Sequence, residues 1–230
     1  MLTELLHRRD RLLAHILSNR PLGRTFLELT VVMVVSAALY GIVLGFWHGA
    51  RLAAYDAVKL PLVLMITSAF TMLFSWIAAL VFNVPVRFGQ VVVLTLLGLA
   101  TASVALASLA PAAWFFTLCA PAPSSAARTT HNSLYLMHTG LVAVCGMTGT
   151  RALWHGMLRL GQTRRVVRRV YVLWVLAYAI VGGEVAWALR PFVGSVSSKY
   201  PIVFLREDAL RGNVYEFIAT DIIPYLWSRK

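Results

Sequence analysis

Residues 88–109, FGQVVVLTLLGLATASVALASL, decide the fold of this chain. The stretch contains no charged side chain and lies between Arg87 and the helix-breaking Pro111. A helix of about 20 mostly apolar residues is long enough to cross the roughly 30 Å hydrocarbon core of a bilayer. The stretch therefore predicts a transmembrane helix.

Four further apolar stretches have the length and composition of transmembrane helices, and they cover residues 26–47, 60–82, 133–149 and 170–189. Pro61 is expected in the first turn of its helix, where a proline is tolerated. The stretch 133–149 is the shortest and the most polar of the set. The sequence thus predicts an all-α integral membrane protein whose residues 25–190 form a domain of about five spans.

The overall composition points the same way. Hydrophobic residues make up 59% of the 230-residue chain and charged residues only 13%, with a mean hydropathy of +0.74. Soluble domains hold roughly 45–50% apolar and about 25% charged residues. The net charge of +12 is concentrated beside the apolar stretches, where it faces lipid headgroups, so we expect a lipid bilayer and no nucleic acid as partner.

The positions of the basic residues predict the orientation. With five spans and an inner N-terminus, twelve basic residues lie inside, namely Arg8, Arg9, Arg11, Arg20, Arg24, Arg87, Arg151, Arg159, Arg164, Arg165, Arg168 and Arg169. Only Arg51, Lys59 and Arg128 lie in the outer loops. Because basic residues stay on the cytoplasmic side, we expect a bacterial inner-membrane protein with its N-terminus in the cytoplasm and its C-terminus outside.

Residues 1–24 are predicted to form a cytoplasmic amphipathic helix. Their leucines and Ile16 recur at helical spacing, and the charged side chains lie mostly on the other face. Two placements fit this pattern: a helix in the membrane interface, or one packed on the protein's own bundle. The segment is too charged for a cleaved signal peptide, so we expect the first span to remain as an anchor.

Residues 191–230 are predicted to form an ordered amphipathic tail outside the membrane. Charged residues break its apolar runs, but apolar side chains recur at helical spacing over 211–226. So much apolar and aromatic surface indicates docking. The residues that we expect to contact a partner are Phe204, Arg206, Asn213, Tyr215 and Phe217.

A polar cluster is expected near the outer ends of the spans, formed by Glu184, Lys59, Asp56 and Arg190. Ionisable residues inside a membrane usually face the bundle interior and pair with one another. Glu184 is therefore expected to pair with Lys59 or Arg190. The pattern leaves two roles open for Glu184, a proton or cation relay and a structural anchor.

Few other residues suggest chemistry. His138, with His131 and Cys145 nearby, suits either a haem or chlorin ligand or a packed, hydrogen-bonded imidazole, and we expect no cofactor.

Catalytic, nucleotide-binding and metal-binding motifs are absent from the sequence, and the two cysteines do not have metal-ligand spacing. Small residues on 133–149 (Gly140, Ala143, Gly146, Gly149) and on 88–109 (Gly98, Ala102, Ala105, Ser108) suit close helix packing.

Three stretches carry a family resemblance: DAVKLP at 56–61, residues 83–90, and WALRPFVG at 187–194 continuing through FLRE at 204–207 to GNVYE at 212–216. Together with the five-span layout, they resemble small bacterial polytopic membrane proteins with a Yip1-like arrangement. The resemblance covers some 60 residues. It implies membrane organisation and partner binding, and it identifies no catalytic residue.

These observations favour a non-enzymatic membrane subunit or scaffold that binds a protein partner, a lipid or both. The alternative is a small transporter or channel, complete only as an oligomer, that uses the carboxylate of Glu184. A membrane protein partner or a homo-oligomer is expected in either case.

Overall fold

The computed structural model describes residues 2–7, 9–18, 21–123, 128–193, 203–205 and 212–217. Within these ranges all regular secondary structure is helical, so the expected all-α class is confirmed. In chain order the helices are α1 (Leu2–His7), α2 (Arg9–Leu17), α3 (Gly23–Phe46), α4 (Ala50–Val81), α5 (Phe88–Ser108), α6 (Ala110–Cys119), α7 (Arg128–Leu158), α8 (Arg164–Ala188) and α9 (Val214–Phe217).

Four of the described helices are long and apolar enough to cross a membrane, namely α3, α4, α5 and α8. The predicted stretch 133–149 lies inside α7, which has 31 residues and ample length to cross. Polar side chains such as Asn132, Thr139 and Arg151 lower the hydropathy of α7, and it is not among the four. The helical membrane class is confirmed, and the number of five spans stays a prediction.

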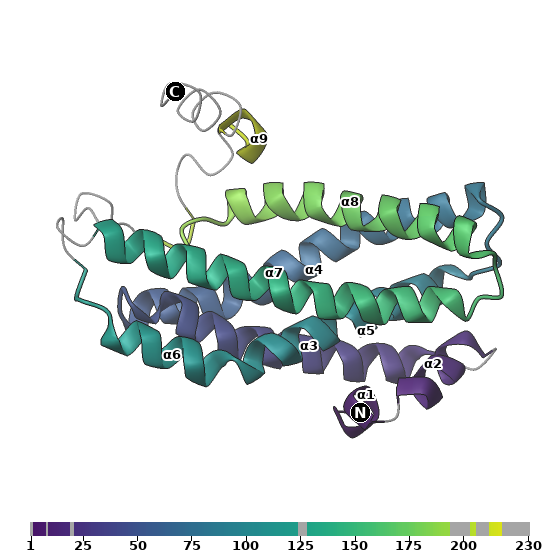
Figure 1. Ribbon diagram of the computed structural model, residues 1–230, viewed down its shortest axis with the longest axis horizontal. Helices are drawn as coiled ribbons and strands as arrows, with labels where there is room; N and C mark the ends of the chain where they lie inside the picture. Colours follow the sequence, from purple (N-terminus) through teal and green to yellow (C-terminus); the bar gives the residue numbers. More distant parts are fainter. Residues whose placement is uncertain are drawn as a thin grey trace.

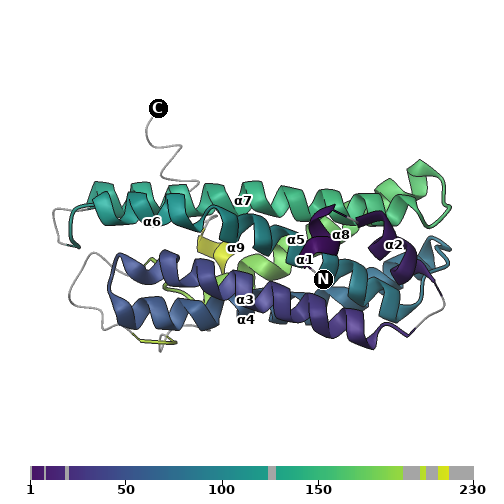
Figure 2. The ribbon, with the colours of Figure 1, turned by 90° about the horizontal axis from the view of Figure 1, so that it is seen from below.

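The five long helices lie side by side along the longest axis of the molecule (Figure 1; Figure 2). Helix α3 packs against α4 and α5, α5 packs against α7, and α4 packs against α8. Helices α7 and α8 contact each other much less extensively. Helix α8 therefore joins the bundle mainly through α4.

Helix α5 occupies the centre of the bundle because small residues line one of its faces. A side chain on Gly149 of α7 would overlap the carbonyl oxygen of Gly98 and lie 3.0 Å from the Cβ of Ala102. The expected small-residue faces of these two helices therefore meet each other within the chain. Gly140 and Gly146 take no part in this contact, because a Cβ added at either would meet nothing within 4 Å.

Helix α4 corrects the sequence prediction. The second span was expected to begin at residue 60, but α4 begins at Ala50 and contains Arg51, Asp56 and Lys59. Pro61 accordingly lies in the interior of the helix and not in its first turn. The charged residues argued against a membrane helix, but the fold buries Asp56 and Lys59 inside the bundle.

The N-terminal helices pack onto the bundle, as in one of the two expected placements. Leu5, Leu12, Leu13 and Ile16 are buried in the same core cluster as α5. The Gln90 side chain donates a hydrogen bond to the Ile16 carbonyl oxygen (3.2 Å), and Arg159 pairs with Asp10 (2.6 Å).

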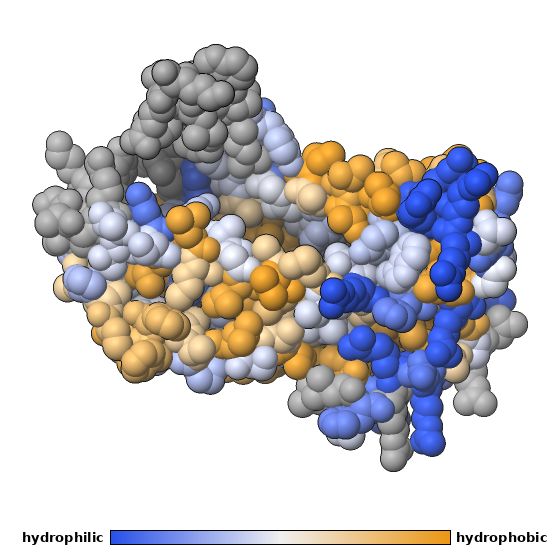
Figure 3. All heavy atoms as spheres, viewed as in Figure 1, coloured by the Kyte–Doolittle hydropathy of each residue, from blue (hydrophilic) through white to orange (hydrophobic). Residues whose placement is uncertain are grey.

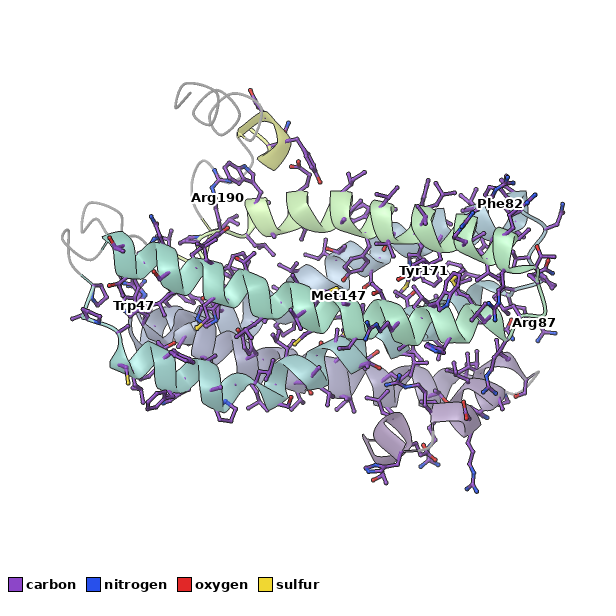
Figure 4. The ribbon with its side chains drawn as sticks, viewed as in Figure 1. Trp47, Phe82, Arg87, Met147, Tyr171 and Arg190 are labelled. Carbon is purple, nitrogen blue, oxygen red and sulfur yellow. The ribbon has the colours of Figure 1, made fainter. Side chains whose placement is uncertain are left out.

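The two ends of the bundle differ in polarity. Hydrophilic side chains gather toward one end of the molecule and apolar ones cover much of the rest of the visible face (Figure 3). Arg87 lies at this hydrophilic end, whereas Trp47 and Arg190 lie toward the other (Figure 4). Many apolar side chains on α3, α4, α7 and α8 are exposed, as expected for helices that face lipid.

Candidate functional site

The predicted polar cluster is built on a close contact between α3 and α4. A side chain on Gly41 would overlap the main-chain carbonyl oxygen of Asp56, and a Cβ on Gly45 would lie 2.7 Å from the Asp56 carboxylate. Glycines four residues apart leave one face of a helix free for close approach of another helix. We call this α3–α4 contact the glycine seam. The spacing of Gly41 and Gly45 is a sequence signal that the prediction missed.

Lys59 is completely buried and is held by groups distant in the sequence. Its ammonium donates a hydrogen bond to the Pro191 carbonyl oxygen at 2.9 Å and lies 4.0 Å from the Asp56 carboxylate. The rings of Phe192 and Phe204 lie 5.7 Å and 5.5 Å from the same ammonium, within the range of cation–π attraction. A carboxylate, a carbonyl and two aromatic faces thus surround one buried cation.

Asp56 is less well satisfied than Lys59. It is also fully buried, and neither of its carboxylate oxygens accepts a hydrogen bond from the described part of the chain. Desolvation of such a pair offsets much of its attraction, but removing one partner leaves an uncompensated buried charge. The pair is therefore a sensitive point of the fold.

The structure does not bring the whole predicted cluster together. Among the described residues no ion pair joins Glu184 to Lys59 or Arg190, and the Glu184 Oε1 atom is buried without a hydrogen-bond partner. The Arg190 guanidinium instead lies 3.8 Å from the centre of the Trp187 indole and donates to the Trp187 carbonyl oxygen (2.9 Å). Asp56 and Lys59 form a pair, whereas within the described part of the chain neither Glu184 nor Arg190 forms an ion pair with either of them.

Two of the predicted tail residues contact the bundle. The Phe204 ring packs edge-on against Tyr55 of α4 (5.5 Å between centroids), and the Tyr215 hydroxyl donates to the Ile180 carbonyl oxygen of α8 at 2.8 Å. Partial burial and the negative charge of Glu184 raise the pKa of the Tyr215 phenol, which keeps it protonated as a donor. The described tail segments therefore contact both α4 and α8.

The other three tail residues play different parts. The Asn213 side chain accepts a hydrogen bond from the Glu216 amide (2.6 Å), which caps the short helix α9. The backbone of Phe217 closes α9, whereas Arg206, the side chain of Phe217 and most of the predicted helix over 211–226 lie outside the described residues.

A second buried polar pair joins α3 to α7. The Tyr40 hydroxyl and the Nδ1 atom of His138 lie 2.8 Å apart, and both side chains are buried. This contact fits the packed imidazole that the sequence left open, and the separation of 98 residues explains why no local pattern indicated Tyr40. Cys119 and Cys145 are free thiols. No group of three His, Cys, Asp or Glu residues within the described ranges is placed to hold a metal ion.

The fold and this site define a helical membrane protein with a charge pair buried at one end of its bundle. No family model, curated protein or solved structure matches the chain. The resemblance to Yip1-like proteins therefore rests on the sequence motifs and stays a prediction.

Proposed function

We propose that the protein is a non-enzymatic subunit or scaffold of the bacterial inner membrane, and that it recruits a protein partner through its outer end. The observation that carries this proposal is the contact of the described tail segments with two separate helices, α4 and α8. A segment held at several points presents a fixed surface, which lowers the entropic cost of binding.

The side chains next to these anchors are free to meet a partner. Leu205 follows the packed Phe204 and is 50% exposed, and the Tyr215 ring is 43% exposed although its hydroxyl is bound. Apolar and aromatic side chains displayed on a fixed backbone are typical of binding surfaces. The described tail segments therefore supply contact area, and the bundle holds these segments in place.

The proposal includes five spans, with the N-terminus inside and the tail on the outer side, from which Tyr215 reaches along α8 as far as Ile180. Helix α7 has the length of a fifth span and packs along α5. The ion pair between Arg159 and Asp10 places the N-terminal helices at the same end as the basic loop after α7. A common cytoplasmic side for these basic segments follows the positive-inside rule.

Truncation after Gly194 tests the scaffold. In mild detergent we expect the full chain to co-purify with a membrane protein partner, and the truncated chain to insert normally but lose that partner. Leu205→Ser should weaken the complex in the same way. The matched control is Val81→Ser, which makes the same kind of change at a 70% exposed apolar residue at the C-terminal end of α4. Retention of every partner by the truncated chain would refute the proposal.

One observation favours the alternative, a small oligomeric transporter or channel. Asp56 and Glu184 are both carboxylates within membrane helices, and the oxygens named above lack hydrogen-bond partners among the described residues. Such carboxylates are typical of proton and cation pathways. Purified protein in liposomes should then carry a proton or cation flux that Asp56→Asn or Glu184→Gln abolishes. A flux unchanged by both substitutions excludes these carboxylates as relays.

A further inference from the structure

A cavity of about 280 Å³ lies inside the bundle, among α4, α5, α7 and α8. Its wall is almost wholly apolar and includes Leu64, Gly98, Leu106, Gly146, Trp174 and Val175. An engineered cavity of about 150 Å³ lined by Leu, Ile and Phe stays dry and binds small apolar molecules. This cavity has nearly twice that volume, so its lining favours an apolar occupant over water.

The cavity is elongated along the bundle. On α5 its lining runs from Thr95 to Leu106 and on α7 from Val142 to Leu153. At 1.5 Å per residue each of these stretches covers about 16 Å. The long axis of the cavity is therefore parallel to the helices, and hence to the hydrocarbon chains of a bilayer around them.

The cavity is open on one side. Helices α7 and α8 line it from opposite sides and contact each other little. Val142, which lines it, is 41% exposed, and on the outer faces of the two helices Met147 and Leu176 are 55% and 52% exposed. Figure 4 shows Met147 about half-way along the bundle. An occupant that enters between these helices comes from the hydrocarbon region of the membrane.

One polar atom in the lining lacks a partner. The Ser103 hydroxyl is buried (2% exposed) and makes no hydrogen bond with the described residues. The hydroxyls of Thr95 and Thr150, which also line the cavity, donate to carbonyl oxygens of their own helices at 2.8 Å and 3.0 Å. A buried donor without an acceptor is costly, so Ser103 indicates an occupant that carries an acceptor oxygen.

We propose that the cavity binds one long hydrocarbon chain of a membrane lipid, which enters between α7 and α8 and lies along α5, with Ser103 donating a hydrogen bond to an oxygen of that lipid. This site is separate from the tail surface and does not depend on it. The shared chemistry, a long apolar chain with an acceptor oxygen, occurs in glycerophospholipids and in free long-chain lipids.

Two glycines on α7 provide a matched test. A side chain at Gly146 meets no atom within 4 Å and enters the cavity, whereas a side chain at Gly140 also meets none but lies outside the cavity lining. We expect full-length protein, purified in mild detergent and washed extensively, to retain about one lipid per chain by native mass spectrometry. Gly146→Leu should lose this lipid, and Gly140→Leu should keep it.

Ser103→Ala tests the polar contact. Loss of one hydrogen bond worth about 1 kcal/mol should reduce lipid retention roughly fivefold. Extraction and mass identification of the retained lipid distinguish a glycerophospholipid from a free long-chain lipid, and either result supports the proposal. Equal lipid content in wild type, Gly146→Leu and Gly140→Leu would overturn it. Unchanged retention in Ser103→Ala would refute the role of the hydroxyl.

A fluorescence measurement does not depend on a lipid that stays bound through the detergent wash. Trp174 lines the cavity and is buried, so a bromine-labelled chain in the site should quench its emission. We would reconstitute the protein in vesicles of phospholipid brominated on its acyl chains and compare each protein with its own Trp174→Phe variant. The Trp174-dependent quenching should be present in wild type and Gly140→Leu and absent in Gly146→Leu. Equal quenching in all three would contradict the proposal.

Discussion

The α3–α4 side of the bundle is closely packed, whereas the α7–α8 side leaves an open cavity. At the glycine seam, Gly41 and Gly45 let the α3 and α4 backbones touch around Asp56. Between α7 and α8, Trp174 and Val175 line an open cavity instead. Hydropathy does not predict the difference, because the closed side carries the charged residues Asp56 and Lys59 whereas the open side is lined by apolar side chains. The difference lies in side-chain size at the contact, which decides whether two membrane helices close together or leave space.

Helix α7 shows both kinds of packing within one turn. Gly149 lies against Gly98 of α5 with no space for a side chain, whereas Gly146 lines the cavity with no atom within 4 Å of an added Cβ. Two glycines three residues apart therefore have different roles. Gly149 allows close packing against α5, and Gly146 leaves space in the cavity. The following substitutions test this distinction, beginning with the largest expected effect.

Lys59→Met should destabilise the closed side most. The substitution leaves the Asp56 carboxylate buried without its cation, which costs about 3–5 kcal/mol. Unfolding by heat or denaturant in detergent measures the change in the free energy of unfolding. The double variant Lys59→Met/Asp56→Asn removes both charges and should recover most of the lost stability. A single variant as stable as wild type would contradict the assigned role of the pair.

Gly41→Ala should have the next largest effect and lower the free energy of unfolding by about 3 kcal/mol. The new methyl group overlaps the Asp56 carbonyl oxygen, and because the Cβ position is fixed by the α3 backbone and the oxygen belongs to the α4 backbone, the seam must open. Gly23→Ala is the control, since Gly23 is on the same helix and an added Cβ there meets nothing within 4 Å. Equal stability of the two variants would mean that the seam is not closed.

Gly149→Ala should cost about 1–3 kcal/mol, because its methyl group overlaps the Gly98 carbonyl oxygen and crowds Ala102. Gly146→Ala should have the opposite sign. Alanine is favoured over glycine in a helix by about 0.5–1 kcal/mol, and the cavity has room for a methyl group. Unfolding curves of the two variants, measured side by side, check both signs, and destabilisation of equal size in the pair would remove the distinction between the two glycines of α7.

Tyr215→Phe should weaken docking of the tail by only about 0.5–1.5 kcal/mol and leave the bundle itself unchanged. It removes the hydrogen bond to the Ile180 carbonyl oxygen and keeps the ring. Protease accessibility of the 203–217 region, compared with wild type, measures docking, and overall stability of the bundle should not change. Undiminished protection of this region would show that other contacts hold the tail.

The sequence predicted the parts of the fold that depend on hydropathy. The stretch 88–109 corresponds to α5 within one residue, and 26–47 corresponds to α3 within three. The start of α4 was missed by ten residues because Asp56 and Lys59 read as polar linker. Their burial depends on Gly41 and Gly45 of another helix, and local composition does not report such a contact.

Most of the site depends on contacts between distant residues. Asp56 and Lys59 are three residues apart on one helix, so their proximity follows from helical spacing. Lys59 meets Pro191, and Tyr40 meets His138, only because α3, α4, α7 and the end of α8 pack as they do. Glu184 was expected to find a cation because one was nearby in the predicted topology, but its neighbour in the structure is Tyr215 of the tail.

The hydrogen bond from Lys59 to Pro191 also has a consequence for biosynthesis. Its partners are 132 residues apart, and ribosomes add about 5–20 residues per second, so Lys59 is made roughly 7–26 s before Pro191. During that interval the charged N-terminal part of α4 has neither this acceptor nor the rings of Phe192 and Phe204. The full set of contacts around Lys59 therefore forms only after the chain has been made past the end of α8, so the charged part of α4 is completed by a late segment of the sequence.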